Sequence, residues 1–407
     1  MKTKNKKLWQ KNNSNELDSF VEDYTVGIDY ILDYELVKYD AIASIAHVKM
    51  LCSIKVITEE EQKKLIKGLK IILNKIEDGE FDIEKEDEDC HTAIENFLTE
   101  KYGDVGKKIH TGRSRNDQIL TAIRLHMKEK TKELISEIEN LIHSFENKID
   151  QYGDVVMPGY THMQKAMPSS VSLWLGSFMD SLKDDLVCLK GISKVIDQNP
   201  LGSVAGYGEN VFGLDREMTT RLLKFSHIQE NPMYCAMSRG KFEFMLLQII
   251  SFVMFDINKF ATDLMLYTTF EYSFCSLPDS FTTGSSVMPQ KHNYDAVELM
   301  IAYCSMFPAI VSEIQNVIWK LPSGYSRGFQ LTKEPYLKGM KISLETIKIA
   351  SLVVDNLIMN VDKLKKACTK ELYATEEAYK LVKNKNIPFR EAYKIIGKKY
   401  NKLSGKT

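Results

Sequence analysis

The chain has 407 residues, of which 44% are hydrophobic and 27% charged, a composition typical of a folded globular protein and not of a disordered chain. Its 54 basic and 55 acidic residues leave a net charge of -1, so no overall positive field favours nucleic acid or an anionic membrane. This length predicts either several domains or one very elongated domain.

The first residues of the chain, 1–20, are basic but lack an apolar core, which argues against a secretory signal. We expect no apolar run of transmembrane length, because Asp256 and Lys259 interrupt the most apolar stretch, Phe244 to Phe260. The seven cysteines are scattered without a CxxC pair, which predicts reduced thiols and no zinc site. A cytoplasmic protein without nucleic-acid or membrane partners is therefore expected.

Apolar residues recur at helical spacing over much of the chain, and residues 1–157 contain no proline. Between Ile119 and Phe145 the apolar positions lie mostly three, four or seven residues apart, which predicts one long amphipathic helix. Further long helices are expected over about 169–197, 242–260, 294–318 and 334–360. No period-two pattern of useful length indicates a strand.

These patterns predict an all-α fold with a long central helical bundle and smaller helical domains at its ends. The expected boundaries are 1–110 for the N-terminal domain, 111–352 for the central bundle and 353–407 for the C-terminal domain. Helices of about 25 to 30 residues are about 40 Å long and expose broad apolar faces in a single chain. We therefore expect a homo-oligomer that buries these faces, with a self-contained bundle as the alternative.

The first of three polar segments, residues 110–118, directly precedes the long helix that begins near Ile119. It contains two of the eight arginines of the chain, together with Ser114 and Asn116. A helix N-terminus and arginine side chains both favour a bound carboxylate. The alternative is a capped helix start, with Asn116 or Asp117 as the N-cap.

The second polar segment, residues 159–164, contains His162 just after a proline. Histidine titrates near neutral pH and serves as a general acid or base, although a single loop histidine is more often structural.

The third polar segment, residues 282–293, is a loop between two apolar helices. It offers the hydroxyl groups of Ser285 and Ser286 and the cation of Lys291. A flexible loop with small residues can close over a substrate, and an ordinary surface loop is the alternative. Beyond it, Asp295 and Glu298 lie three residues apart, as in a simple capping pair for the next helix.

The string GSSVMPQKHN at 284–293 resembles the signature loop of the fumarase/aspartase superfamily. HTGRSRNDQ at 110–118 and GYTHMQ at 159–164 resemble the argininosuccinate lyase family within it, as do PLGSVAG at 200–206 and the segment 374–398. Fumarase and aspartase resemble GSSIMPGKVNP and adenylosuccinate lyase GSSxMPHK, so the Gln-Lys pair here favours the argininosuccinate lyases. The resemblance covers nearly the whole chain in the family's order.

This resemblance implies the reversible cleavage of argininosuccinate to arginine and fumarate, a step of arginine biosynthesis. It implies elimination through an aci-carboxylate carbanion, without a metal ion or other cofactor. It also implies a homotetramer of all-α subunits in which motifs from three different subunits build each active site.

By the same resemblance, Ser285 abstracts the proton, activated by Lys291 or by backbone amides of its loop. His162 is the partner acid or base, oriented by Glu298 of another subunit, and the resemblance leaves open which of the pair is acid in each direction. The expected substrate-binding residues are Asp29, Ser114, Arg115, Asn116, Thr161, Asn293, Tyr325, Gln330 and Lys333. A histidine near the pocket corresponds to His91, for which a structural role is equally expected.

The chain departs from the family pattern mainly on the arginine side of the site. The segment from Tyr325 to Glu334 lacks acidic residues that the family has, Asp29 replaces a serine, and the family's SDRD reads Met237-Ser-Arg-Gly240. These changes favour a second hypothesis, a sister lyase that acts on another succinyl or fumaryl compound. A third hypothesis is a non-enzymatic protein that reuses the scaffold, as lens crystallins do.

Overall fold

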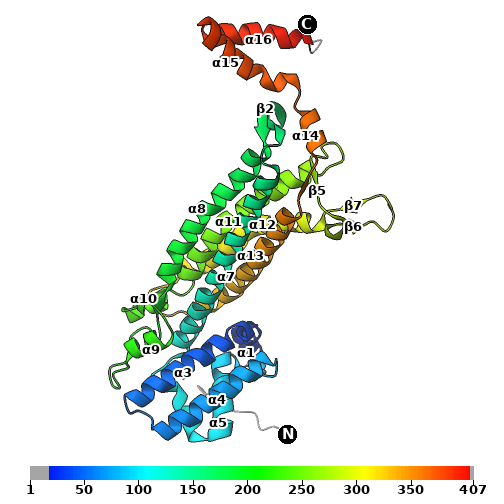
Figure 1. Cartoon of the computed structure of the whole chain (residues 1–407). Coiled ribbons are helices and arrows are strands. Elements are labelled where there is room, and N and C mark those ends of the chain that lie inside the picture. Colours follow the sequence, from blue (N-terminus) through cyan, green and yellow to red (C-terminus); the bar gives the residue numbers. More distant parts are fainter. Residues whose placement is uncertain (1–17, 404–407) are drawn as a thin grey trace. The chain divides into compact units, whose positions relative to one another are not determined.

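The protein is known here from a computed structural model that describes residues 18–403, so most of the basic N-terminal segment lies outside the described residues. The described chain is mostly helical, which confirms the predicted all-α class (Figure 1). All the predicted long helices are present: α7 (Arg115–Tyr152), α8 (Val171–Ile196), α11 (Lys241–Tyr267), α12 (Asp295–Ile318) and α13 (Lys333–Asp355). The last is shorter than predicted, because β8 (Ile358–Met359) pairs with β5 (Cys275–Ser276) just beyond it.

The chain divides into two compact units, and each long helix contributes one part to each unit. Unit 1 contains the residues up to 135 together with 188–251 and 307–342. Unit 2 contains 136–187, 252–306 and the residues from 343 onward. The division into three consecutive domains stays a prediction.

The N-terminal part of unit 1 is a cluster of helices built on α3 (Val37–Ser53), α4 (Glu59–Glu77) and α5 (Cys90–Tyr102). Their hydrophobic core includes Leu51, Leu65, Leu69, Ile72, Ile94 and Leu98. The short elements around it are α1 (Ser19–Val26), α2 (Asp29–Leu32), η1 (Asp33–Glu35), η2 (Lys85–Asp87), α6 (Asp104–Lys107) and η3 (Lys108–His110).

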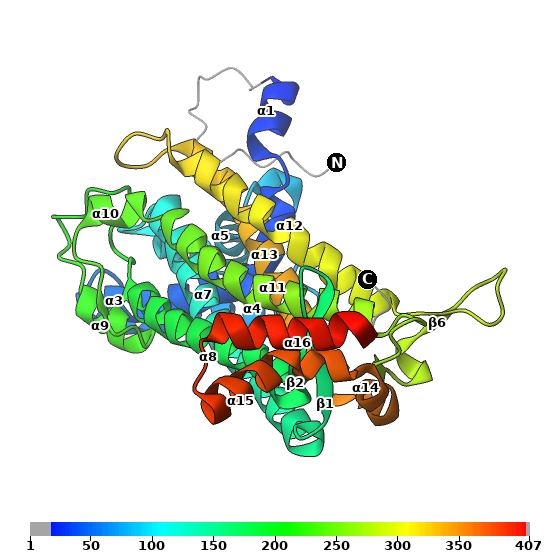
Figure 2. The ribbon, with the colours of Figure 1, turned by 90° about the horizontal axis from the view of Figure 1, so that it is seen from above.

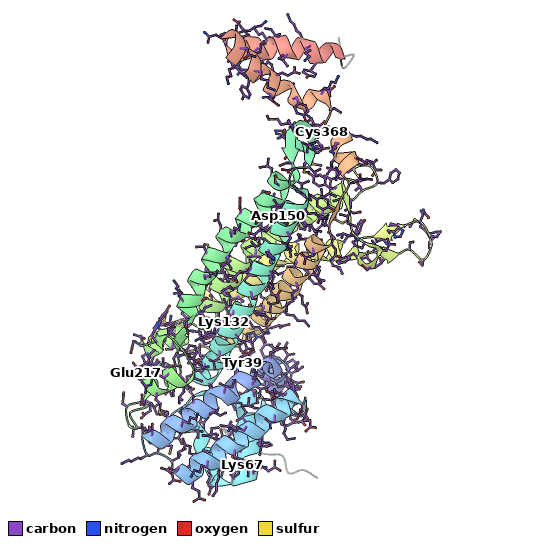
Figure 3. The ribbon with its side chains drawn as sticks, in the orientation of Figure 1. Tyr39, Lys67, Lys132, Asp150, Glu217 and Cys368 are labelled. Atoms are coloured by element: carbon purple, nitrogen blue, oxygen red, sulfur yellow. The ribbon has the colours of Figure 1, made fainter. Side chains whose placement is uncertain are left out.

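A chain of aromatic and polar contacts joins α3 to the parts of α7 and α13 in unit 1. Tyr39, labelled in Figure 3, packs edge-on against His126 and donates a hydrogen bond of 3.0 Å to Glu129. His126 Nδ1 in turn lies 2.7 Å from the Tyr336 hydroxyl oxygen. Because Tyr39, His126 and Tyr336 are buried and hydrogen-bonded, they fix how these parts of α3, α7 and α13 pack in unit 1.

Unit 1 also contains a connecting region between α8 and α11, with β3 (Gln198–Asn199) parallel to β4 (His227–Ile228). The short helix α9 (Arg216–Leu222) lies between the two strands in sequence, and α10 (Pro232–Met237) follows β4. The guanidinium group of Arg216 donates to backbone carbonyls of Leu201 and Gln229 at 2.9 Å each, which ties this irregular backbone together.

Besides the β5–β8 pair, unit 2 contains two β-hairpins, or ribbons, which the sequence analysis did not predict. β1 (Val156–Thr161) and β2 (Gln164–Ser170) form an antiparallel hairpin in which Pro158 lies opposite Pro168. The prolines and a bulge between Pro158 and Tyr160 obscure the alternating pattern of a strand. The second ribbon pairs β6 (Thr283–Gly284) with β7 (His292–Asn293) and extends from the helices of its unit (Figures 1 and 2).

The C-terminal part of unit 2 consists of α14 (Val361–Ala367), η6 (Lys370–Tyr373), α15 (Ala374–Lys385) and α16 (Phe389–Leu403). Helices α15 and α16 lie side by side in Figures 1 and 2, joined by a stacked pair of Tyr379 and Phe389 rings 5.2 Å apart. The core of the unit's bundle is aromatic, with the Phe145 and Phe260 rings 5.2 Å apart. The remaining short helices of the chain are η4 (Asp279–Phe281) and η5 (Arg327–Thr332).

Two of the long helices, α11 and α12, are long and apolar enough to cross a membrane by length and composition alone. The expectation that no run reaches that length was wrong, because the few charged residues do not offset the broad apolar faces. About half of the apolar window of α11 (50%) is buried inside the protein, as in a core helix. In unit 2 both helices also expose large apolar side chains, among them Phe252, Phe255 and Leu299.

Gly240 lies between α10 and α11, where neighbouring side chains leave no room for a Cβ atom. Its φ is +77°, and a Cβ atom would lie 2.5 Å from Ile318 Cγ2 and 3.0 Å from Thr332 Cγ2. Gly240→Ala should lower the free energy of unfolding by about 2 to 4 kcal/mol, from backbone strain and overpacking together. Urea denaturation followed by circular dichroism measures this loss.

Gly79→Ala is the matched control, because Gly79 has a φ of +71° but no atom within 4 Å of the added Cβ. That variant should lose only about 1 kcal/mol. Equal losses in the two variants would contradict the steric argument.

Candidate active site

The first polar segment folds into the start of α7, with Ser114 as the residue before the helix. Ser114 Oγ accepts a hydrogen bond of 3.3 Å from the Asn116 N–H, and the Ser114 N–H donates to Asp117 Oδ1 at 2.8 Å. The capping residue is therefore Ser114, and the sequence-based alternatives Asn116 and Asp117 were wrong as N-caps.

Asp117, which the sequence analysis did not include in the site, connects this helix start to the segment 200–206. Its Oδ2 atom accepts hydrogen bonds from the backbone N–H groups of Gly202 (3.0 Å) and Val204 (3.2 Å). Burial raises the pKa of Asp117 to about 6. Next to it, Asn116 donates to the Val204 carbonyl at 3.4 Å, while its own buried amide oxygen has no partner among the described residues.

Arg115 projects from the first turn of α7 toward the N-terminal end of α5. Its guanidinium group lies 2.9 Å from Glu88 Oε2 and 3.4 Å from Asp89 Oδ2, and it donates to Thr92 Oγ1 at 3.0 Å. The side chain keeps 31% of its surface exposed. An incoming carboxylate can therefore reach this arginine, in competition with the acidic pair.

A small pocket in unit 1 brings together six of the predicted residues: Asp29, His91, Arg115, Tyr325, Gln330 and Lys333. It is also lined by residues that the sequence analysis did not place there: Asp33, Asp89, Ile119, Arg239 and Arg327. The sequence offered one signal for Arg239, since it is the arginine of the Met237-Ser-Arg-Gly240 segment. The sequence did not predict the others, because the pocket is lined by five stretches that lie far apart along the chain.

Lys333 is the most deeply buried of these residues, with 2% of its side chain exposed. Its Nζ atom lies 2.5 Å from Asp33 Oδ1 and 3.0 Å from Asp29 Oδ1. The other oxygen of Asp33 accepts a hydrogen bond of 2.9 Å from the Cys90 N–H. Burial raises the pKa of Asp29, while the charge of Lys333 opposes the rise.

Gln330 and Tyr325 are also predicted to bind the arginine half of the substrate, and they differ in whether their side chains are free to contact a ligand. Gln330 donates to the backbone carbonyls of Thr25 and Val26 at 3.2 and 3.1 Å, so its side-chain nitrogen is engaged within the protein. Tyr325 is 45% exposed and presents its ring at the pocket.

His91 lines the same pocket but is also part of a buried ionic network. Its Nδ1 atom lies 2.9 Å from Asp40 Oδ2, and Arg113 lies 3.3 Å from the other oxygen of Asp40. Although burial opposes it, the charge of Asp40 raises the pKa of His91. Asp40, Cys90 and His91 come close enough to suit a metal ion, but the two cations already neutralise Asp40, so we interpret the group as an ion-pair network.

In unit 2, Thr161 and His162 lie at the tip of the β1–β2 hairpin. Thr161 pairs with Gln164, and the two residues between them, His162 and Met163, have φ angles of +52° and +58°. Positive φ at both central residues is typical of the tight turns that close two-residue hairpins. The turn leaves the His162 imidazole exposed, where it can meet a group from outside its unit.

Ser285 lies at the start of the loop between β6 and β7. Its Oγ atom accepts hydrogen bonds from the backbone N–H groups of Val287 (3.2 Å) and Met288 (3.0 Å). Two N–H donors stabilise negative charge on a hydroxyl oxygen, which is the kind of contact that activation by loop amides requires. The activation of Ser285 stays a prediction. Lys291 closes the turn through its backbone and leaves its side chain exposed.

The remaining predicted residues of this loop region lie at its base. Asn293 on β7 pairs with Thr283 on β6, and Glu298 lies exposed in the first turn of α12. Asp295 accepts a hydrogen bond of 2.5 Å from the Thr283 hydroxyl. Its carboxylate therefore anchors the ribbon, which differs from the simple capping pair considered from the sequence.

Known proteins of one family are similar to this chain over nearly its whole length. The chain matches the family model described as "Lyase" over residues 12–307. It is 43% identical over 400 residues to the argininosuccinate lyase of Thermotoga neapolitana, covering 97% of this chain and 98% of that protein. It is 41% identical to the argininosuccinate lyase of Phocaeicola vulgatus, covering 96% of this chain and 87% of that protein.

The chain belongs to the argininosuccinate lyase family. The resemblance inferred from the three motifs is thereby confirmed. Among solved structures, an EDDS lyase variant with bound fumarate has a TM-score of 0.81 at 22% identity, covering 97% of this chain and 78% of that chain. That likeness concerns the fold alone, and it agrees with the helical architecture described above.

In this member of the argininosuccinate lyase family, Lys333 should act first as the charge partner of two carboxylates. Lys333→Met should lower the free energy of unfolding by about 3 to 5 kcal/mol, because it leaves the buried Asp29 and Asp33 without a cation. Urea denaturation measures the loss. The double variant Lys333→Met/Asp33→Asn should recover part of it, and a single-variant loss below about 1 kcal/mol would refute the interpretation.

Proposed function

We propose that this protein catalyses the reversible elimination of argininosuccinate to arginine and fumarate, a step of arginine biosynthesis, in the cytoplasm. The observation that carries the proposal is the position of Ser285, whose hydroxyl oxygen accepts two backbone N–H bonds within a loop that matches the superfamily signature. The curated relatives of nearly the same length carry the name of this activity.

In the direction of cleavage, Ser285 takes a proton from the substrate carbon next to a carboxylate group. The electron pair of the broken C–H bond moves into that carboxylate, which becomes an aci-form with two negative charges on its oxygens. The carbon–nitrogen bond then breaks, fumarate forms, and the leaving guanidino nitrogen receives a proton. His162 is the partner group for proton transfer, and the roles of the pair exchange when the reaction runs backwards.

The charge that develops on the carboxylate requires donors that are already in place. Ser114, Arg115, Asn116, Thr161 and Asn293 are the groups that we assign to the succinyl carboxylates. Arg115 supplies the cation. A substrate carboxylate binds it either together with Glu88 and Asp89 or by displacing them. Asn116 follows Arg115 in sequence and is buried, and its side-chain N–H group, which lies 3.4 Å from the Val204 carbonyl, is the donor that we assign to a carboxylate.

We further propose a homotetramer whose active sites combine groups from different subunits, with Glu298 of one subunit orienting His162 of another. Large apolar side chains exposed on the unit 2 parts of α11 and α12 support assembly, among them Phe252 and Phe255 (51 and 57% exposed). The exposed position of His162 at a hairpin tip also suits a site completed by a neighbouring subunit.

The proposed activity predicts fumarate release from argininosuccinate, followed by absorbance. Ser285→Ala and His162→Asn should each lower kcat by about a thousandfold, because each removes one proton-transfer group. Asparagine at 162 also tolerates the positive φ of the hairpin turn, so that variant tests chemistry and not folding. Ser286→Ala, in the neighbouring exposed position, should keep wild-type activity.

A substrate panel separates the alternatives. Turnover of adenylosuccinate or aspartate but not of argininosuccinate would support a sister lyase, the hypothesis that the altered segment from Tyr325 to Glu334 favours. Absence of turnover with every succinyl compound at high enzyme concentration would favour a non-enzymatic scaffold.

The shared active site makes a prediction of its own. Ser285→Ala and Arg115→Gln subunits should each be nearly inactive, since each lacks one part of every site. Dissociating the two variants together and reassembling them should restore a part of the activity, because some mixed sites then contain both intact groups. If mixing restored nothing while sedimentation showed mixed oligomers, the proposal that different subunits share one site would be wrong.

A further inference from the structure

Unit 2 contains a pocket of its own, between the β1–β2 hairpin and the helices α8 and α11. Its volume is about 420 Å³, which is enough for a small organic molecule. The hairpin contributes residues between Met157 and Ser169, and the helices contribute Trp174, Asp263 and Tyr267 among others. The functional groups discussed so far use none of these three helix residues.

The walls of the unit 2 pocket are aromatic and aliphatic. The rings of Trp174 and Tyr267 lie 5.2 Å apart in an edge-on arrangement, and each residue is almost completely buried. Tyr160 adds a third ring from the hairpin, and Leu173 and Met163 are exposed at the surface of the pocket. Aromatic rings attract organic cations, and aliphatic side chains contact the alkyl groups that such cations carry.

Asp263 is the one acidic residue that lines this pocket. Its Oδ2 atom accepts a hydrogen bond of 3.0 Å from the Trp174 Nε1–H group, which holds the carboxylate in place. Within residues 18–403, no lysine, arginine or histidine forms an ion pair with it. Lys259 acts on Asp263 only at longer range, because its ammonium group lies over the Phe255 ring, 5.3 Å from the ring centre. Burial raises the pKa of Asp263, as expected for a half-buried carboxylate without a cation beside it.

The chemistry of the lining favours one class of ligand. A metal cation such as Ca²⁺ or Mg²⁺ requires several oxygen ligands, and this pocket offers a single carboxylate among mostly apolar groups. The same carboxylate repels anions, including the carboxylate groups of the proposed substrate. A singly charged ion with an alkyl surface matches both the one negative charge and the apolar walls.

We infer that the unit 2 pocket binds a small organic cation of the alkylammonium class. The positive charge lies against Asp263, and the alkyl groups contact the rings of Trp174, Tyr267 and Tyr160. His162 also borders the pocket, so the bound cation lies close to one of the two groups proposed for proton transfer. The inference does not require the proposed lyase activity, because it depends only on the lining of this pocket.

The test compares tetramethylammonium with tert-butanol, a neutral molecule of similar size and shape. Isothermal titration calorimetry on the full-length protein, at low and constant ionic strength, should show tetramethylammonium binding about tenfold more tightly than tert-butanol. Asp263→Asn removes the charge but keeps an oxygen that can accept the Trp174 N–H bond. This variant should bind tetramethylammonium about tenfold more weakly than the wild type and bind tert-butanol equally well.

Two further variants complete the test. Asp150→Asn is the matched control, because it removes an exposed carboxylate of unit 2 that does not line the pocket (Figure 3), and it should bind tetramethylammonium as the wild type does. Tyr160→Leu keeps the inference testable if Asp263→Asn does not fold. It removes one aromatic ring from a half-buried position and should weaken tetramethylammonium binding by a few-fold.

Three results would overturn the inference: no binding of tetramethylammonium by the wild type, equal binding of the charged and the neutral molecule, or undiminished binding of tetramethylammonium by Asp263→Asn. Equal binding would identify an apolar groove without selectivity for charge. None of these measurements uses fumarate release, so a failure of the proposed lyase activity and a failure of this cation site are separate results.

Discussion

Pairing of buried charges is the constraint on which the unit 1 pocket depends. Lys333 is almost completely buried and requires the two carboxylates of Asp29 and Asp33. Those carboxylates stand at the start of the chain's helical part, and Lys333 begins α13, so one ion-pair cluster connects segments about 300 residues apart. The same requirement pairs Asp40 with His91 and Arg113 beside them. Most charged side chains of the pocket are therefore paired with one another. A charged side chain without a partner stands out as a candidate for ligand binding.

This framework explains why the substrate-facing groups are few. Arg115 shares its charge with an acidic pair, which holds the guanidinium group in position and sets a cost for any carboxylate that displaces that pair. Arg239 has no such pair. The pocket therefore contains one arginine that is paired with acidic side chains and one, Arg239, whose Nε atom has no partner among the described residues.

The two groups that we propose for proton transfer, Ser285 and His162, are positioned in a different way, by backbone geometry. Ser285 depends on N–H groups of its own loop, and His162 on a hairpin turn with two positive φ angles. Neither arrangement needs a buried core, and His162 is exposed while Ser285 is half-buried on the hairpins that carry them. Such exposure suits groups that act on a pocket supplied by another part of the assembly, as the proposed shared site requires.

The sequence by itself determined the helical class, the positions of the long helices and the family. Helical periodicity is local, and it depends only on which residues lie three or four positions apart. The motifs are local too, since each polar segment occupies about ten consecutive residues, and most of the candidate residues could be named from them. The β1–β2 hairpin escaped this reasoning, because its prolines and its bulge remove the alternation on which a strand prediction depends.

Only the tertiary structure decided which charges pair. It showed that Lys333 is committed to Asp29 and Asp33, that Asp117 holds the 200–206 segment against α7, and that Arg239 enters the pocket unpaired. The physical reason is that ionic pairing and burial depend on distance in space, between residues up to 300 positions apart. No local pattern in the sequence predicts which of these residues lie close together in space.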